Sequence, residues 1–171
     1  MLKLINNLKM FFEDCYEGIN VRKYARLMKI SPPTASKLLN DYYNQGLLRR
    51  QKDLGYLFFY ANPESKNFLD LSRIYWRIKL NDLIEWLQKL LTRPAGILFG
   101  SLAKGEAKKD SDVDIWLFSQ FNKREIDLKK FEKKLGRKIS LFQSRSLETI
   151  DNKPLRNNVV NGYLLFGRLK W

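Results

Sequence analysis

Apolar side chains recur every three or four residues in the first part of the chain, a spacing that predicts amphipathic helices. The predicted helices cover residues 2–17, 21–28 and 32–43. Ser31 stands at the N-cap of the third helix and Pro32 at its first turn, where a proline loses no helical hydrogen bond. Gly18 and Gly46 follow the first and third helices. This part of the chain therefore predicts three short helices.

After Gly46 the helical spacing stops and two short apolar and aromatic runs follow. Residues 47–52 and 56–61 are typical of strands, and residues 53–55 form the turn between them. We therefore expect a β-hairpin whose first strand is strongly basic.

The next segment carries a single apolar stripe. Its members alternate four- and three-residue steps and are Trp76, Leu80, Leu83, Leu87 and Leu90. This spacing predicts one helix of about 24 residues over 68–91. Residues 62–65 precede it as a linker. The stripe either packs on its own domain or pairs two copies of the chain, so a homodimer stays open.

The second half of the chain alternates apolar strands with polar helices. We expect strands at 94–99 and 137–142, a helix over 122–135 closed by Gly136, and a short helix followed by a final strand within 155–171.

Charge and composition narrow the chemistry. The chain has 171 residues, with 32 Lys and Arg against 18 Asp and Glu, a net charge of +14 and no histidine. Ligation of zinc by histidine and imidazole acid–base catalysis are therefore excluded, and Cys15 alone forms no disulfide within the chain. The charge favours an anionic partner, nucleic acid or nucleotide phosphate, although it also serves solubility.

No apolar run approaches the length of a membrane span, and the first residues lack the continuous apolar stretch of a secretion signal. The sequence predicts a soluble, cytoplasmic protein without a membrane partner.

Residues 19–62 resemble the winged helix-turn-helix of microbial transcription regulators. The resemblance lies in the sequence NVRKYARLMKISPPTASKLLNDYYNQGLLRR and in the hairpin that follows it. The resemblance implies binding to duplex DNA, although such folds also serve as protein–protein modules. The residues that we expect at base edges are Thr34, Ser36 and Lys37, and those that we expect at phosphates are Arg49, Arg50 and Lys52.

A second motif follows the strand at 94–99. It consists of Gly100, Ser101, Gly105, Ser111, Asp112 and Asp114, in this order and spacing. This segment resembles the signature of the polymerase-β-like nucleotidyltransferase superfamily, most closely its minimal nucleotidyltransferase branch. The resemblance covers residues 93–167 and implies a small mixed-sheet domain that binds a nucleoside triphosphate.

The spacing of the two aspartates explains the chemistry. Two residues apart on a strand, Asp112 and Asp114 project from the same face and can hold magnesium for nucleotidyl transfer. We expect Gly100 and Ser101 to approach the triphosphate, with Gly105 and Ser111 in the same nucleotide-binding segment. Lys104, Lys108 and Lys109 either add phosphate contacts or form a solvated face.

One position departs from the superfamily pattern. The family supplies a third carboxylate from a later strand, and Ser140 stands at that place. A serine is a weak magnesium ligand and no carboxylate base, so the two-metal site is expected to be incomplete. Glu148 and Asp151 fall beyond the strand, where no spacing argument brings them to the site.

These patterns predict an α+β chain with a winged helix-turn-helix at 1–62, a linker helix at 63–92 and a nucleotidyltransferase-like domain at 93–171. The function that we expect is a DNA-binding regulator whose second domain binds metal and nucleotide with little or no turnover. The alternatives are an active magnesium-dependent transferase acting on protein, RNA or a small molecule, and a surface that binds RNA. By resemblance alone, the chain could also pair with a small helical toxin-type protein.

Overall fold

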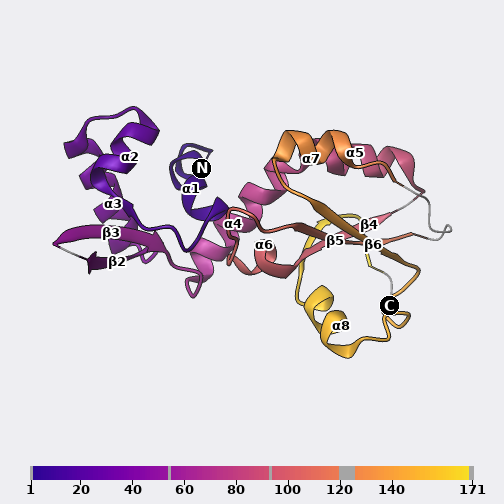
Figure 1. Ribbon diagram of the computed structural model, residues 1–171. Coiled ribbons are helices and arrows are strands. Elements are labelled where there is room, and N and C mark those ends of the chain that lie inside the picture. The colour runs from indigo at the N-terminus through magenta and orange to yellow at the C-terminus, as the bar shows by residue number, and fades with distance from the viewer. Residues whose placement is uncertain (1, 54, 93, 120–125, 170–171) are drawn as a thin grey trace. The chain divides into compact units, whose positions relative to one another are not determined.

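The computed structural model describes residues 2–53, 55–92, 94–119 and 126–169, and the chain forms two compact units (Figure 1). The first unit contains the residues up to Tyr75 together with Gly105–Lys109. The second contains Trp76–Lys104 and the residues from Asp110 onward. This boundary differs from the predicted division, since it falls inside a helix and assigns part of the second motif to the first unit.

The first unit combines short helices with a small antiparallel sheet (Figure 1). Its elements before the helix at the boundary are α1 (Leu2–Glu13), β1 (Ile19–Asn20), α2 (Val21–Met28), α3 (Pro32–Asn44), β2 (Leu48–Asp53) and β3 (Tyr56–Ala61). The strand order is β1-β3-β2, and the β2–β3 hairpin is the predicted one. Three helices followed by a hairpin are the arrangement that the resemblance to a winged helix-turn-helix predicts. Sequence periodicity missed β1, because two residues are too few to show an alternation.

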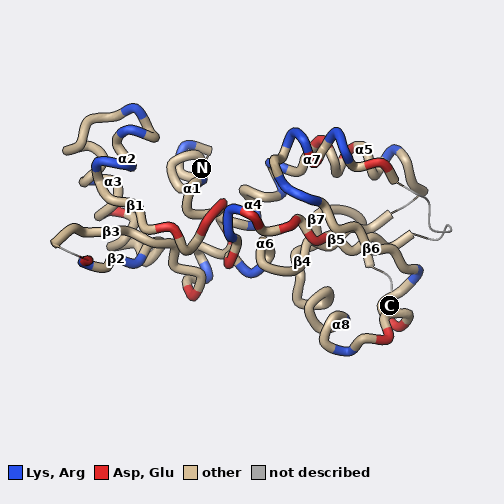
Figure 2. Tube along the Cα trace, in the orientation of Figure 1, with Lys and Arg blue, Asp and Glu red and all other residues tan. Residues whose placement is uncertain are grey.

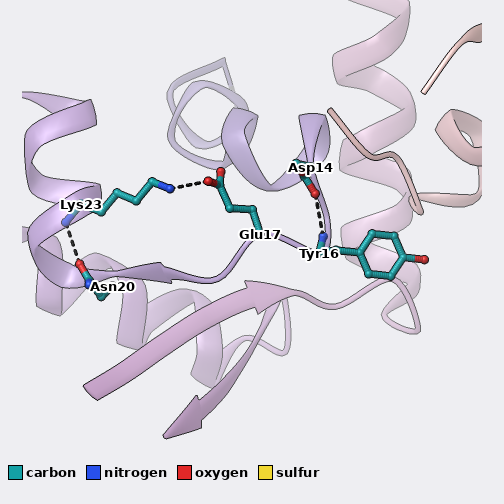
Figure 3. Close-up of polar contacts among 5 residues, drawn as sticks. All are labelled: Asp14, Tyr16, Glu17, Asn20 and Lys23. Atoms are coloured by element: carbon teal, nitrogen blue, oxygen red, sulfur yellow. Dashed lines mark hydrogen bonds and ion pairs between the residues drawn. The ribbon is translucent and has the colours of Figure 1, made fainter. Parts of the chain in front are cut away.

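The connection between α1 and α2 is built from side-chain caps (Figure 3). Asn20 accepts a hydrogen bond of 2.9 Å from the Lys23 amide, and Lys23 forms an ion pair with Glu17. Asp14 accepts one of 3.1 Å from the Tyr16 amide. These local bonds compete with helical ones, so α1 ends at Glu13, before the predicted end at residue 17.

The core of the first unit is aromatic. Its largest fully buried members include Phe11, Phe12, Tyr24, Phe59 and Phe68. Cys15 belongs to the same core, and burial, aided by the nearby Asp14 charge, raises the pKa of its thiol to about 11. The cysteine is therefore an uncharged packing residue at neutral pH.

The predicted single helix over 68–91 is wrong. The structure has two helices, α4 (Lys66–Lys79) and α5 (Asn81–Leu90), separated at Leu80, whose φ of −90° and ψ of 3° leave the helical range. Leu80 still donates to Trp76 and accepts from the Ile84 amide, so the apolar stripe continues across the break. The apolar spacing alone does not reveal this break, because the spacing continues unchanged from one helix to the next.

The second unit is a four-stranded mixed sheet with helices, as predicted. The strands are β4 (Ala95–Phe99), β5 (Val113–Phe118), β6 (Ile139–Ser144) and β7 (Tyr163–Phe166), in the order β6-β5-β4-β7. Only the β5–β6 pair is parallel. Alternate residues of β4 and β5 pack with Leu147, Ile150 and Val159 to form the core on one face.

Three helices of this unit are α6 (Gly100–Lys104), α7 (Lys129–Leu135) and α8 (Lys153–Val160). The helix predicted over 122–135 begins only at Lys129, and the Asp127 carboxylate accepts a hydrogen bond of 3.1 Å from the Lys129 amide. Residues 122–125 of that prediction lie outside the described residues. Within the described part of the chain, no helix has the length and apolar character to cross a membrane.

Candidate functional site

The two aspartates of the second motif lie at the start of β5. Asp112 immediately precedes the strand and Asp114 is its second residue, while Val113 between them points into the core. Burial, and then repulsion from the Asp112 charge, raise the pKa of Asp114 above its usual value. The two carboxylates therefore lie close together, and a bound divalent cation offsets the repulsion between their charges.

Gly100 makes room for the second of these carboxylates. A Cβ atom built on Gly100 would lie 2.3 Å from Asp114 Oδ2, and the residue has a φ of +71°. Phe99, just before it, pairs with Asp114 across β4 and β5. The sequence predicts that Gly100 opens space for a triphosphate, whereas in this structure the Asp114 carboxylate fills the space beside it.

We expect Gly100→Ala to weaken magnesium-dependent nucleotide binding, because the added methyl group must displace the Asp114 carboxylate. Gly136→Ala is the matched control, since Gly136 has a similar φ of +65° and open space around its Cβ position. Both variants bear the strain of a positive φ, about 1 kcal/mol. Thermal melting and calorimetric titration of both variants measure the difference, and equal losses would refute the role of Gly100.

Ser140 lies beside the aspartates, where the sequence placed the missing carboxylate. In the parallel β5–β6 pair its register partner is Asp114. Glu148 instead hydrogen-bonds to Ser146, which lowers the pKa of Glu148. Among the residues that the structure describes, no group of three histidine, cysteine or acidic residues is assembled for a metal. The site thus offers two carboxylates and a neighbouring hydroxyl.

The other residues of the motif divide between the two units. Ser101 lies in α6 of the second unit, and Lys104 of that helix donates to Asn158 at 3.2 Å. Gly105 belongs to the first unit, where its Cβ position faces Leu69 and Phe68. Lys108 and Lys109 are also assigned there, with the Lys108 ammonium 5.4 Å from the Tyr16 ring centre.

Arg137 is a residue of the site that sequence reasoning missed. It is buried, and its Nη1 donates a hydrogen bond of 2.6 Å to the carbonyl of Ser111, directly before Asp112. Its guanidinium lies 5.1 Å from the Trp76 ring centre. Arg137 therefore ties the start of β6 to the segment that carries Asp112. The two bonded residues are 26 positions apart, so no local spacing could reveal the contact.

The residues expected to meet DNA lie on α3 and β2 of the first unit. Thr34 and Lys37 are exposed near the start of α3, whereas Ser36 is half-buried. Ser31 caps the helix as predicted, and its hydroxyl lies 2.8 Å from that of Thr34. Lys37 is the most accessible of the three residues for a base or phosphate contact. Ser36 is half-buried, and the Thr34 hydroxyl already has a hydrogen-bond partner.

The two arginines of β2 have different surroundings. The Arg50 guanidinium lies 4.1 Å from the Tyr43 ring centre and donates to Asn40 of α3 at 3.4 Å. Arg49 Nε instead donates to the Ala61 carbonyl at 3.3 Å, and its Nη1 lies 3.9 Å from Glu64. Neighbouring residues of a strand face opposite sides of the sheet, which explains why Arg49 and Arg50 have different partners.

Lys52 shares the side of Arg50, since it lies two residues further along β2. Figure 2 shows basic positions on β2 and also on α2 of this unit. The structure thus brings Arg50 together with α3, and it leaves Arg49 paired with an acidic residue.

Parts of the chain are similar to known proteins. The crystal structure of MepR, a transcription regulator of the Staphylococcus aureus multidrug efflux pump MepA, aligns with a TM-score of 0.40 and 17% identity. The alignment covers 52% of this chain and 63% of that one. No curated protein matches significantly. Residues 80–141 match the family model described as a nucleotidyltransferase domain, so this part of the chain carries the sequence pattern of such a domain.

Proposed function

We propose that the protein is a DNA-binding regulator whose second unit binds a magnesium–nucleoside triphosphate with little or no turnover. The observation that carries this proposal is the register of β5 and β6, which sets Ser140 beside Asp114. Two aspartates suited to bind a metal and nucleotide therefore lie beside a neutral serine. The nucleotidyltransferases that the chain resembles have a third carboxylate at the position of this serine.

The residues present fit a hard cation. Asp112 and Asp114 supply the oxygen ligands that magnesium prefers, and their mutual repulsion favours binding of a positive charge. When bound, magnesium supplies charge neutralisation for the triphosphate. Arg137 holds the Ser111 carbonyl and so positions the backbone before Asp112. Gly100 leaves space for the Asp114 carboxylate.

Ser140 accounts for the low turnover that we propose. Its hydroxyl can donate or accept a hydrogen bond, but it does not accept a proton from an attacking group at neutral pH as a carboxylate does. Glu148 lies beyond β6, and a hydrogen bond with Ser146 lowers its pKa, so we do not expect it to replace the missing group. Loss of a general base commonly lowers a rate by about 10²- to 10⁴-fold.

DNA binding by the first unit is supported by its fold and by its basic residues. Lys37 is exposed near the start of α3, and Arg50 is held beside the same helix by Asn40 and Tyr43. A helix of this kind enters the major groove, while basic residues at its side contact phosphates. The positive net charge of the chain favours the same partner.

Titration with each magnesium–nucleoside triphosphate, followed by an assay for transfer of labelled nucleoside monophosphate, tests the proposal. We expect saturable binding and little labelled product. Ser140→Asp is expected to raise any transfer by about tenfold or more, because it adds a carboxylate beside Asp114. Ser140→Asn introduces a side chain of the same size as aspartate but without the charge, and it is expected to leave the transfer rate unchanged.

Three results would contradict parts of the proposal in different ways. Efficient transfer by the unaltered protein would show an active nucleotidyltransferase, in which another group acts as the base. Absence of binding for all four nucleotides would show that the second unit is no nucleotide site. A rise in transfer with Ser140→Asn as well as Ser140→Asp would show that charge is not the missing property.

A further inference from the structure

An aromatic cluster continues the face of the sheet that carries the candidate site. Asp114 and Trp116 lie two residues apart in β5, and their partners in β6 are Ser140 and Phe142. The rings of Trp116 and Phe142 are nearly parallel, with an interplanar angle of 4° and centres 5.4 Å apart. Phe99 packs against both rings. Asp114 and the aromatic rings therefore lie along the same face.

Only one ring of this cluster is open to solvent. Trp116 is 7% exposed and Phe99 is 6% exposed, whereas Phe142 is 39% exposed. The Trp116 indole is held in place, since Nε1 donates to the Ser144 hydroxyl at 2.7 Å, and that hydroxyl donates to the Ser146 carbonyl at 3.0 Å. Phe142 is thus an exposed ring supported from behind by a fixed indole.

From this arrangement we infer that Phe142 stacks on the base of the nucleotide whose phosphates are bound at Asp112 and Asp114. This inference rests on the proposed function and deepens it, because it names the part of the ligand that contacts β6. Two residues along a strand correspond to about 6.6 Å, and neighbouring strands are about 4.8 Å apart. Phe142 is therefore roughly 8 Å from Asp114 at the backbone, a separation that one nucleotide spans.

The surroundings favour a nucleobase over a larger apolar partner. One exposed ring offers far less area than a stable protein interface needs, and the neighbouring carboxylates oppose an anionic membrane surface. A base needs only one ring to stack on, because each base has an extended π face. Purines present a larger face than pyrimidines, so we expect the site to prefer purine nucleotides.

The test compares three probes by calorimetric titration: magnesium–ATP, magnesium–CTP and magnesium–tripolyphosphate, which has no base. The unaltered protein is expected to bind ATP more tightly than CTP and CTP more tightly than tripolyphosphate. Phe142→Ala should weaken ATP binding by roughly tenfold to hundredfold. It should leave the affinity for tripolyphosphate unchanged, since Phe142 contacts no phosphate.

Two further variants of Phe142 separate stacking from packing, and a variant of Leu164 is the control. Phe142→Leu keeps an apolar side chain without a ring and should lose the preference for ATP, while Phe142→Trp should keep it. Leu164→Ala removes a comparably exposed apolar side chain, 43% exposed, from β7 at the opposite edge of the sheet, and should have no effect. Thermal melting establishes that each variant is folded.

The outcomes distinguish this inference from the function on which it rests. If tripolyphosphate binds but Phe142→Ala leaves ATP affinity unchanged, the stacking contact is refuted and the phosphate site stands. An equal loss for ATP and tripolyphosphate would show that Phe142 supports the sheet and contacts no base. If none of the probes binds the unaltered protein, both the inference and the proposed nucleotide site are wrong.

Discussion

Asp114→Asn is expected to weaken magnesium-dependent nucleotide binding strongly and, at the same time, to raise the melting temperature of the free protein. The Asp114 carboxylate is partly buried and faces the charge of Asp112, and both effects disfavour its ionised form. Asparagine has nearly the same shape without the charge, so the repulsion disappears. The same substitution removes an anionic ligand of the metal.

The expected loss of affinity for magnesium–ATP is about 100-fold or more, since even residues that only support metal ligands commonly account for about 10- to 100-fold. Calorimetry measures the affinity and differential scanning calorimetry the melting temperature. Asp151→Asn is the control, because Asp151 is exposed on the loop after β6 and should affect neither quantity. Unchanged nucleotide affinity in Asp114→Asn would remove the aspartate pair from the site.

Arg50→Ala is expected to weaken binding to duplex DNA by roughly tenfold to hundredfold, the range for a charged hydrogen bond. Arg50 lies over Tyr43 and bonds to Asn40, so its charge is positioned beside α3. Arg49→Ala is the matched control, because Arg49 lies near Glu64 and part of its charge is already neutralised. We expect a much smaller loss for this variant.

The salt dependence of binding gives an independent readout. Each phosphate contact contributes about 0.9 to the slope of log affinity against log salt concentration, so Arg50→Ala should reduce that slope by about 1. Arg50→Lys should restore it. A mixed-sequence duplex suffices, because phosphate contacts do not depend on base sequence. Equal effects of Arg49→Ala and Arg50→Ala would mean that the basic strand acts only through its total charge.

Local sequence patterns predicted most of the helices and strands, because each depends on residues a few positions apart. The cap formed by Ser31 and the basic hairpin are confirmed on these grounds. The places where prediction failed are the break at Leu80, the early end of α1 at Glu13 and the late start of α7 at Lys129. In the last two cases an aspartate side chain bonds to a backbone amide two residues on, and hydrophobic spacing carries no signal for such bonds.

The sequence also predicted that Asp112, Asp114 and Ser140 lie near one another, while their roles in binding stay predictions. Asp112 and Asp114 are two residues apart, and the alternation along a strand predicts carboxylates on one side. In the structure Asp112 immediately precedes β5, and its charge still acts on Asp114. The prediction that Ser140 lies beside them came from a resemblance, and the register of β5 with β6 is consistent with it.

By itself, the sequence determined the identity of most elements, the two-carboxylate motif and the absence of histidine chemistry. Only the tertiary structure decided which side chains surround that motif. The contact of Arg137 with Ser111, the closeness of Gly100 to Asp114 and the support of Phe142 by Trp116 join different elements. Such contacts depend on how strands pair and pack across many intervening residues, and no periodicity within one element encodes them.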